Sequence, residues 1–548
     1  MRIALMQLNF VVGDIEGNAR KIADAVRHAK TAGADLCVAS ELGLLGYPPR
    51  DLLLYSGFVE LAASKVQQLA RELKDQPPLI VGTAERNASG KGRTLRNAAL
   101  LLQEGEIKST FFKSLLPTYD VFDEDRYFEP GQSPGVALVD GVRIGVTICE
   151  DIWNDKDFWK HQRYSSDPLE RLTGSSTVDC LVNLSGSPFT VGKQEFRESM
   201  LKAIASKYHV PICYVNQVGG NDDLVFDGRS CAVGASGKII AKARPFEEDI
   251  LIVDLQGSSN RIAEDDFTVE SEAWRALVLG TRDYVRKCGF KRVLLGLSGG
   301  IDSALTAALA AEAVGKENVL AVMMPSPYSS QGSIDDSVEL AKRLGIKTEM
   351  LPIQTIMSAF NETLKVPFSG YVPDVTEENI QSRIRGSLLM ALSNKCHAML
   401  ISTGNKSEVS VGYCTIYGDM NGGLAVLADV PKTLVYRLSE WVNRNRGNPI
   451  PRAIIQKAPS AELKPNQTDQ DSLPAYDVLD AILQRYLEQH QSKEEIIASG
   501  FGSAIVEKVA RLVKSAEFKR KQSPPGIKIT DRAFGTGWRV PIASRQDF

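Results

Sequence analysis

The amino-acid sequence predicts an α/β protein of two domains, an α/β sandwich followed by a doubly wound parallel sheet. Three observations carry this prediction. The chain has 548 residues, which is too long for one hydrophobic core. Short β-rich runs alternate with helical patterns through both halves. In the second half alone, the order strand, helix, strand repeats, which is typical of parallel strands joined by crossover helices.

The first domain is predicted over residues 1–255. The runs 97–103 and 106–112 indicate an antiparallel pair, with Glu104-Gly105 as its turn. Further strands are expected at 3–8, 36–40, 78–82, 143–148, 180–185 and 212–217, and helices at 17–32, 58–74 and 193–208.

Residues 256–270 are polar and lack apolar periodicity, so we expect a linker there. The second domain, 271–548, begins with an amphipathic helix at about 271–288. Strands are expected at 293–297, 319–324, 349–353 and 398–403, with helices from 302 and at 331–343 and 377–394. The remainder, from about 430, reads as mostly helical, with a loop-rich piece at 456–475. In a doubly wound sheet the binding crevice lies beyond the carboxyl ends of the strands.

The composition is that of an ordinary globular protein, with 43% hydrophobic and 24% charged residues. A net charge of -3 gives no reason to expect nucleic acid or an anionic membrane as partner. The first residues read as a strand rather than a signal peptide, and no apolar run approaches the length of a membrane span. The eight cysteines form no C-x-x-C pair, which argues against a zinc site or a disulfide framework and favours a reducing cytoplasm.

A glycine-rich turn in the second domain predicts a phosphate site. The string GLSGGIDS (296–303) lies between a buried strand and a helix, where backbone N–H groups and the positive helix end attract an anion. It is neither a Walker loop nor a dinucleotide fingerprint, because G-K-[ST] and G-x-G-x-x-G are both absent. A turn that serves only the fold is the alternative.

SGGIDS resembles the pyrophosphatase loop of N-type ATP enzymes. Further strings resemble one branch, the NAD synthetase family, in the same order: ENIQSRIRG (378–386), STGNKSE (402–408), YGDMNGG (417–423), DVPKT (429–433), PSAELKPNQTDQDSLP (459–474) and FKRKQSPPG (518–526). The resemblance implies an adenine nucleotide α-hydrolase-like fold. It also implies Mg²⁺-dependent amidation of deamido-NAD through an acyl-adenylate, with ATP cleaved to AMP and pyrophosphate.

The resemblance also assigns residues to these ligands. The ATP-binding residues would be Gly296, Leu297, Ser298, Gly299, Gly300, Ile301, Asp302, Ser303 and Thr403. Asn379, Arg383, Glu408 and Lys519 would bind deamido-NAD, and Asp302 and Glu408 would hold the metal. Each of these residues could instead have a purely structural role. Asn379 and Arg383 also suit a solvated helix face, Glu408 a helix N-terminus, and Lys519 a solvated charge cluster.

The first domain contains a candidate cysteine nucleophile. RIGVTICEDIW (143–153) places Cys149 directly after a buried strand, at a turn like a nucleophile elbow. SELGLLGYPPRDLL (40–53) and FFKSLLP (111–117) place Glu41 and Lys113 just past two other strands. A strand-end cysteine is more often a core residue. Together, however, these strings resemble the nitrilase superfamily, with Ser40 departing from a frequent proline, and the resemblance implies an α-β-β-α sandwich.

The superfamily resemblance gives each residue a role in glutamine hydrolysis. Cys149 would attack the amide, Glu41 would act as general base, and Lys113 with the N–H of Glu150 would stabilise the oxyanion. Tyr119, Glu124, Ser187 and Lys193 match glutamine-binding or auxiliary positions. Each also suits a plainer role: Glu124 a surface charge, Ser187 a loop residue and Lys193 a first-turn helix residue.

The two resemblances together imply a ligase that takes ammonia from glutamine and uses it for an ATP-dependent amidation. Its partners would be small molecules, with neither nucleic acid nor membrane, and a homo-oligomer with a dimeric synthetase core is expected. Three rivals remain: a GMP- or asparagine-synthetase-like ligase, an enzyme fed by free ammonia, and a nucleotide-binding module without turnover. Passage of ammonia through a protein tunnel is a hypothesis motivated by two sites on one chain.

Overall fold

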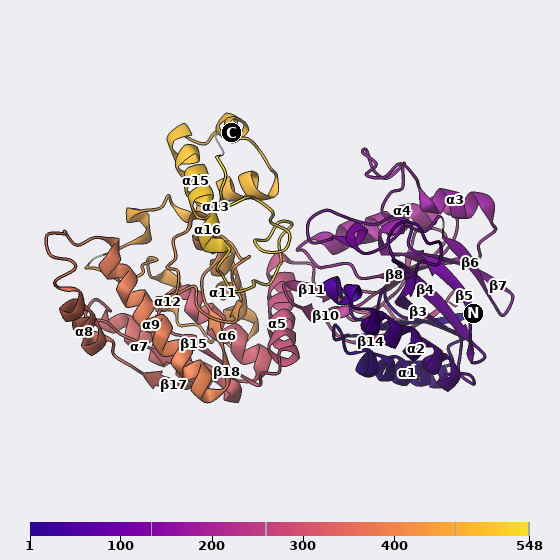
Figure 1. The fold of residues 1–548 in the computed structure, drawn as a ribbon, viewed down its shortest axis with the longest axis horizontal. Coiled ribbons are helices and arrows are strands. Elements are labelled where there is room, and N and C mark those ends of the chain that lie inside the picture. Colours follow the sequence, from indigo (N-terminus) through magenta and orange to yellow (C-terminus); the bar gives the residue numbers. More distant parts are fainter. Residues whose placement is uncertain (133, 258–259, 466, 546–548) are drawn as a thin grey trace. The chain divides into compact units, whose positions relative to one another are not determined.

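The computed structural model describes residues 1–132, 134–257, 260–465 and 467–545. Two compact units make up the chain, Met1–Phe267 and Thr268–Phe548 (Figure 1). Residues 258–259 of the predicted linker, and Asn466 in one of the family-like strings, lie outside the described residues. Within the described part, every helix is too short or too polar to cross a membrane.

The first unit contains two six-stranded sheets. One has the order β14 (Asp249–Asp254), β1 (Arg2–Gln7), β2 (Leu36–Val38), β3 (Leu79–Arg86), β4 (Leu95–Gln103) and β5 (Glu106–Phe112). The other has the order β13 (Ile239–Lys242), β12 (Cys231–Val233), β9 (Ile212–Asn216), β8 (Cys180–Ser185), β7 (Val142–Ile148) and β6 (Gly135–Val139). A small pair, β10 (Val218–Asn221) and β11 (Leu224–Asp227), stands apart from both sheets.

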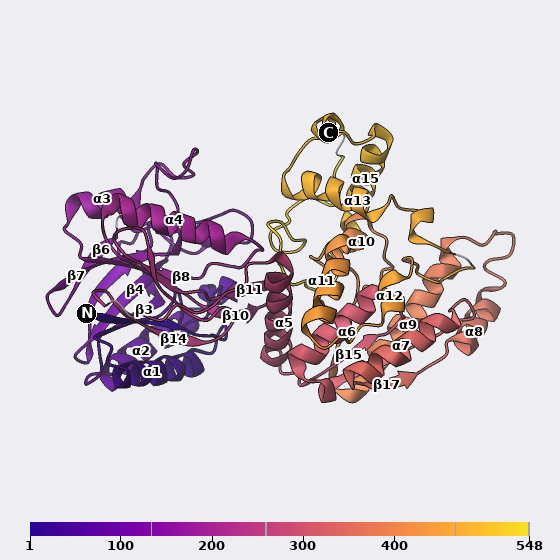
Figure 2. The same cartoon turned by 180° about the vertical axis from the view of Figure 1, so that it is seen from behind.

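Side chains that alternate between the two faces of each strand explain how the layers pack. Ile3 and Leu5 of β1 face the core between the sheets, whereas Ala4 and Met6 face a second core under α1 (Ile15–Thr31) and α2 (Ser56–Glu72). The other sheet packs its outer face against α3 (Pro168–Ser175) and α4 (Lys193–Tyr208). Figure 2 shows these four layers, which confirm the predicted α-β-β-α sandwich.

The segment predicted as a linker is in part attached to the first unit. Ile262 forms a β-bridge with Lys242, and the buried Arg229 pairs with Asp265. The ring of Phe267 lies beneath the guanidinium of Arg229. Polarity alone did not reveal this packing, because the contacts are with residues distant in the chain.

The second unit contains a parallel sheet with the order β17 (Lys347–Met350), β16 (Val319–Met323), β15 (Arg292–Gly296), β18 (Ala398–Ser402) and β19 (Leu424–Ala425). Because the chain adds strands first on one side of β15 and then on the other, the topological switch point lies at the end of β15. The predicted doubly wound sheet is therefore confirmed.

Helices cover this sheet. Apolar residues of α9 (Val375–Cys396), among them Ile380 and Ile384, pack with α8 (Gln354–Leu364) against the strands. The helices α5 (Val269–Lys287), α6 (Ile301–Val314) and α11 (Lys432–Asn445) pack together. The remaining helices are α7 (Gln331–Leu344), α10 (Lys406–Val411), α12 (Arg452–Gln456), α13 (Tyr476–Leu483), α14 (Lys493–Ala498), α15 (Ser503–Ser515) and α16 (Glu517–Arg520).

Candidate active sites

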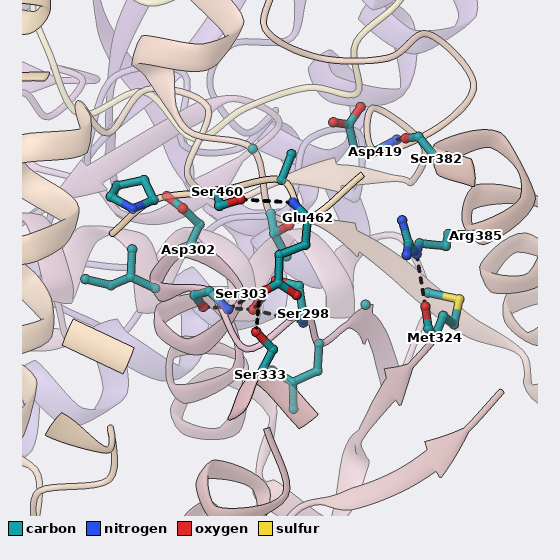
Figure 3. Close-up of a pocket in the computed structure, with 18 of the residues that line it drawn as sticks. Ser298, Asp302, Ser303, Met324, Ser333, Ser382, Arg385, Asp419, Ser460 and Glu462 are labelled. Carbon is teal, nitrogen blue, oxygen red and sulfur yellow. Dashed lines mark hydrogen bonds between the residues drawn. The ribbon is translucent and has the colours of Figure 1, made fainter. Parts of the chain in front are cut away.

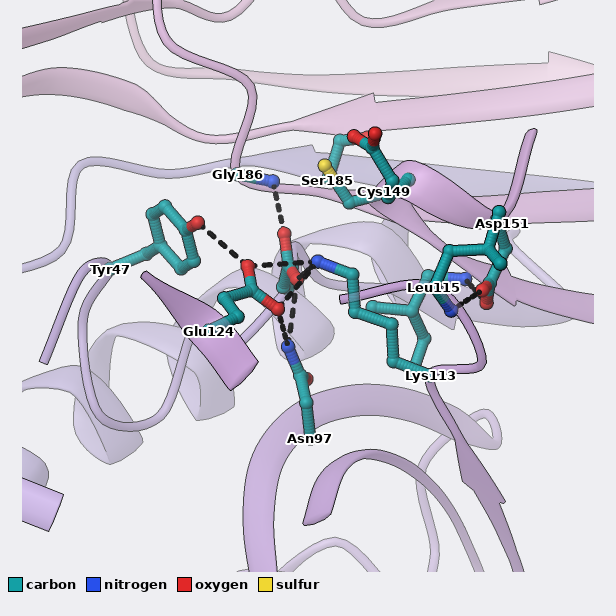
Figure 4. A network of polar contacts seen from close by, with 12 residues as sticks. Tyr47, Asn97, Lys113, Leu115, Glu124, Cys149, Asp151, Ser185 and Gly186 are labelled. Carbon is teal, nitrogen blue, oxygen red and sulfur yellow. Dashed lines mark hydrogen bonds and ion pairs between the residues drawn. The ribbon is translucent and has the colours of Figure 1, made fainter. Parts of the chain in front are cut away.

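Cys149 occupies a strained turn at the end of β7. Its φ is +42°, a value that non-glycine residues adopt at a cost. Asp151 stabilises this turn by accepting hydrogen bonds from the N–H groups of Ile148 (3.0 Å) and of Ser114 (2.9 Å). The same carboxylate therefore joins the cysteine turn to the segment that follows Lys113 (Figure 4).

A buried ion-pair network surrounds Lys113. Its Nζ lies 2.7 Å from Oε1 of Glu41 and 2.8 Å from Oε2 of Glu124. Asn97 donates to Glu41 Oε1 at 2.8 Å, and the N–H of Gly186 donates to Glu41 Oε2 at 3.0 Å. The Glu41 and Lys113 side chains are fully buried, so these bonds fix both groups in a water-poor site.

Burial and charge set the protonation of this site. Burial raises the pKa of Glu124 to about 7 although Lys113 opposes the shift. Burial also works against the charged form of Lys113, but Glu124 and Glu41 outweigh it and hold the pKa of Lys113 well above its usual value. Burial, reinforced by Glu41, raises the pKa of the Cys149 thiol. The thiol is therefore neutral at rest and requires a base to become a nucleophile.

The residues predicted to bind glutamine lie in several environments. Tyr119 donates its hydroxyl to Glu150 Oε1 at 3.0 Å, and Glu124 belongs to the Lys113 network. The Ser187 N–H donates to Asn216 Oδ1 at 2.9 Å. Lys193 Nζ donates to Pro188 O at 2.8 Å and lies 5.6 Å from the centre of the Trp153 ring.

Sequence reasoning missed three residues of this network. Tyr47 donates to Glu124 Oε1 at 2.8 Å, Asn97 bonds Glu41, and Asp151 links the two loops. Tyr47 and Asp151 belong to the same sequence strings as Glu41 and Cys149. Membership of those strings was the one signal that could have marked them as site residues. For Asn97 the sequence pattern indicates only a position in a strand.

The second unit has a cavity of about 300 Å³ at the end of β15 (Figure 3). The residues predicted to bind ATP that line it are Gly296, Leu297, Ser298, Gly300, Ile301, Asp302, Ser303 and Thr403. Gly299 does not line the cavity. Its φ is +78°, and a Cβ there would meet the Ser333 carbonyl oxygen at 2.4 Å, so the turn packs directly against α7.

Carboxylates in this cavity face a buried lysine. Asp302 accepts hydrogen bonds from the ammonium of Lys432 and from Asn405 Nδ2 (2.8 Å), and Glu408 lies 3.6 Å from the same ammonium. Burial, followed by the charge of Asp302, raises the pKa of Glu408 to about 8. The site therefore favours an additional positive charge beyond that of Lys432.

Asp302 and Glu408 suit a magnesium ion in donor type, because hard divalent cations prefer carboxylate oxygens and are completed by water and phosphate. Within the described residues, no group of three His, Cys, Asp or Glu side chains is arranged to hold a metal by itself.

The other residues predicted to bind deamido-NAD do not line the cavity. They converge on the turn 412–416 after α10. Asn379 accepts from Thr415 Oγ1 at 2.8 Å and Arg383 donates to Ile416 O at 3.3 Å. Lys519 Nζ donates to Gly412 O at 2.8 Å.

Several cavity-lining residues were not predicted: Arg385, Lys432, Lys457, Glu462 and Asp469. Arg385 donates to Met324 O at 3.0 Å, and Glu462 accepts from Ser333 Oγ at 2.7 Å. Most of these residues lie in the family-like strings, but spacing alone gave no reason to single them out.

Both halves of the chain match known protein families. The carbon-nitrogen hydrolase family matches residues 2–263, and the NAD synthase family matches residues 273–523. The glutamine-dependent NAD(+) synthetase of Synechocystis sp. is 52% identical over 552 residues, covering 99% of this chain and 98% of that protein. This chain belongs to the glutamine-dependent NAD(+) synthetase family.

Other members of the family also align with this chain over nearly its full length. The glutamine-dependent NAD(+) synthetase of Thermotoga maritima is 44% identical, covering 100% of this chain and 99% of that protein. The solved structure of the Acinetobacter baumannii enzyme with adenosine diphosphate aligns with a TM-score of 0.77 at 41% identity, covering 99% of this chain and 98% of that one. The family consists of carbon–nitrogen ligases that use ATP and small-molecule substrates, so the rival of a nucleotide-binding module without turnover is set aside.

Proposed function

We propose that this chain makes NAD(+) from deamido-NAD and ATP, with ammonia taken from glutamine. The observation that carries the proposal is the buried Glu41–Lys113 pair beside the strained Cys149 turn, on a chain that also has the phosphate-loop cavity. A ligase fed only by free ammonia has no use for that network, which is why we favour the glutamine-fed reaction.

The charges of Glu41 and Lys113 suggest how Cys149 would hydrolyse glutamine. Glu41 takes the thiol proton, because the buried thiol does not ionise alone. The thiolate attacks the amide carbon, and the Lys113 ammonium with the Glu150 N–H stabilises the oxyanion. Ammonia leaves with the proton held by Glu41, and Glu41 then activates water to release glutamate from the thioester. Tyr119, Ser187 and Lys193 are proposed to hold the amino-acid end, and Glu124 to keep Lys113 in place.

Amidation follows in the second unit. The carboxylate of deamido-NAD attacks the α-phosphorus of ATP, and the N–H groups of the 296–303 turn hold the departing pyrophosphate. Ammonia then displaces AMP from the adenylate. Thr403 and the unpredicted Lys432 are proposed to contact ATP. Asp302 and Glu408 would hold Mg²⁺, which supplies positive charge to the phosphate oxygens when bound.

Deamido-NAD is proposed to contact Glu408 and the turn 412–416. Support comes from the hydrogen bonds of Asn379, Arg383 and Lys519, which fix that turn. We further propose a homo-oligomer with a dimeric synthetase core and a reducing cytoplasmic location. Free cysteines such as the buried Cys37 and Cys180 suit the latter.

Product analysis tests the proposal. The purified chain with deamido-NAD, ATP, Mg²⁺ and glutamine should form NAD, AMP, pyrophosphate and glutamate in equal amounts. Formation of ADP, or the absence of a dinucleotide amide, would contradict the adenylate route.

A further inference from the structure

A buried lysine lies between the two carboxylates of the phosphate-loop cavity. Lys432 is the first residue of α11 and lines this cavity. Its ammonium donates a hydrogen bond to Asp302 Oδ2 and lies 3.6 Å from Glu408 Oε1. The centre of the Tyr476 ring lies 5.2 Å from the same ammonium, so the π-electrons of the ring also attract the positive charge. One ammonium therefore pairs with both of the carboxylates that suit a magnesium ion.

Asn405 holds the opposite oxygen of each carboxylate. Its Nδ2 donates to Asp302 Oδ1 at 2.8 Å, and its backbone N–H donates to Glu408 Oε2 at 3.2 Å. Its side-chain oxygen accepts from the Glu408 N–H at 3.0 Å, which caps α10. The two oxygens that remain, Asp302 Oδ2 and Glu408 Oε1, are the ones that face the ammonium. The carboxylates are therefore positioned by hydrogen bonds that do not involve Lys432, as is usual for carboxylates that bind a metal.

The lysine side chain can leave this position while the backbone stays in place. The Lys432 N–H donates to Ser407 Oγ at 2.8 Å, which fixes the start of α11. The ammonium is carried on a flexible four-carbon stem, so it can move without any change in the helix. A divalent cation would be attracted to the same two carboxylate oxygens, because they are hard ligands that carry negative charge. Two cations so close together would repel each other strongly, and the site therefore holds one of them at a time.

We propose that Lys432 is an internal counter-cation, which occupies the divalent-metal position of the cavity until Mg²⁺ and ATP bind together. The inference rests on the metal and ATP roles proposed above. Without the lysine, two carboxylates in a buried site would lack a compensating charge. A metal ion that enters alone must displace the ammonium from both carboxylates, whereas in the presence of ATP the phosphate oxygens accept the displaced ammonium. The exchange therefore makes metal binding depend on the nucleotide.

Binding of Mn²⁺ in the absence of nucleotide tests this role, with free Mn²⁺ measured by electron paramagnetic resonance. Lys432→Met keeps a side chain of similar length but removes the charge. It should bind Mn²⁺ at least about tenfold more tightly than the wild type, because a site that is vacant in about 10% of molecules or fewer binds its ligand correspondingly weakly. The same variant should bind ATP more weakly. Opposite changes in the two affinities would not follow from a purely structural ion pair, whose loss would weaken both.

Three further variants separate this role from folding. Lys457→Met changes another lysine of the cavity, which pairs with one carboxylate, Glu462, at 2.9 Å, and it should leave the Mn²⁺ affinity unchanged. The double variant Lys432→Met/Glu408→Gln lacks one of the two metal-binding carboxylates and should lose the gain in affinity. Lys432→Gln keeps a hydrogen-bond donor for Asp302 and should show the gain even if Lys432→Met does not fold.

Unchanged or weaker Mn²⁺ binding in a folded Lys432 variant, or an equal gain in Lys457→Met, would overturn the assignment. Thermal unfolding followed by circular dichroism establishes which variants are folded. The product assay of the wild type is independent of these measurements. A chain that forms neither AMP nor NAD would refute the proposed function, whereas the Mn²⁺ comparison uses no substrate.

Discussion

Glu124 illustrates how a single residue connects the site to stability. Its carboxyl group has an ordinary pKa of 4.5, which burial raises to about 7 in the folded chain. Between these two pH values the folded state keeps a proton that the unfolded chain has lost. The free energy of unfolding therefore falls as pH rises through this window, by up to about 1.4 kcal/mol per pH unit.

Replacing Glu124 with glutamine should remove this pH dependence, because an amide does not titrate. Thermal unfolding from pH 5 to pH 7 should show the midpoint of Glu124→Gln rising relative to the wild type as pH increases. Glu106→Gln, on an exposed part of β5, should show no such trend. A constant difference between Glu124→Gln and the wild type would contradict the raised pKa.

At the residue scale, the sequence predicted the groups that follow strands. Lys113 and Cys149 directly follow β5 and β7, Glu41 lies three residues after β2, and the fold brings Lys113 Nζ to 2.7 Å from Glu41 Oε1. Tyr47 and Asn97 were missed because their importance lies in contacts across 77 and 56 positions of the chain, with Glu124 and Glu41. Single-sequence patterns do not contain such long-range pairings.

At the scale of elements, the phosphate turn depends on one close contact with α7. Gly299→Ala would place a methyl group against the Ser333 carbonyl at a positive φ, so the turn must shift. We expect ammonia-supported NAD formation to fall at least about tenfold, as a displaced site loses oriented N–H donors. Glutamine hydrolysis should persist.

Gly332→Ala is the matched control, because a Cβ at this α7 residue would meet nothing within 4 Å. It should leave both activities unchanged, as measured by NAD and glutamate formation. An active Gly299→Ala variant would show that the contact between the turn and α7 is dispensable.

Most long elements could be predicted from periodicity. The helix at 193–208 agrees with α4 at both ends, and Glu104-Gly105 forms the β4–β5 turn with positive φ at both residues. The short strands β10–β13 were not predicted, since a strand of three or four residues carries too little pattern. Strand β17 lies earlier than expected, at Lys347–Met350, and all four of its residues are exposed, so alternation gave no guide.

At the scale of the whole molecule, the open question is whether ammonia passes between the sites without entering solution. Glutamine labelled with ¹⁵N at its amide, given together with unlabelled ammonium, should yield NAD in which most new amide nitrogen is ¹⁵N. Channelled ammonia stays unprotonated and therefore nucleophilic, whereas bulk ammonium must first lose a proton before it can react. A label ratio equal to that of the mixed bulk pool would contradict the tunnel hypothesis.

The division of work between the two units is tested most directly by Cys149→Ala, assayed for NAD formation with glutamine and then with ammonium. Glutamine-supported formation should fall by at least about a thousandfold, because the nucleophile is lost. Ammonia-supported formation should stay within about twofold of the wild type, since no residue of the second unit is changed. Cys180→Ala, at another buried cysteine of the first unit, should retain both activities. Equal loss of both activities in Cys149→Ala would contradict the account.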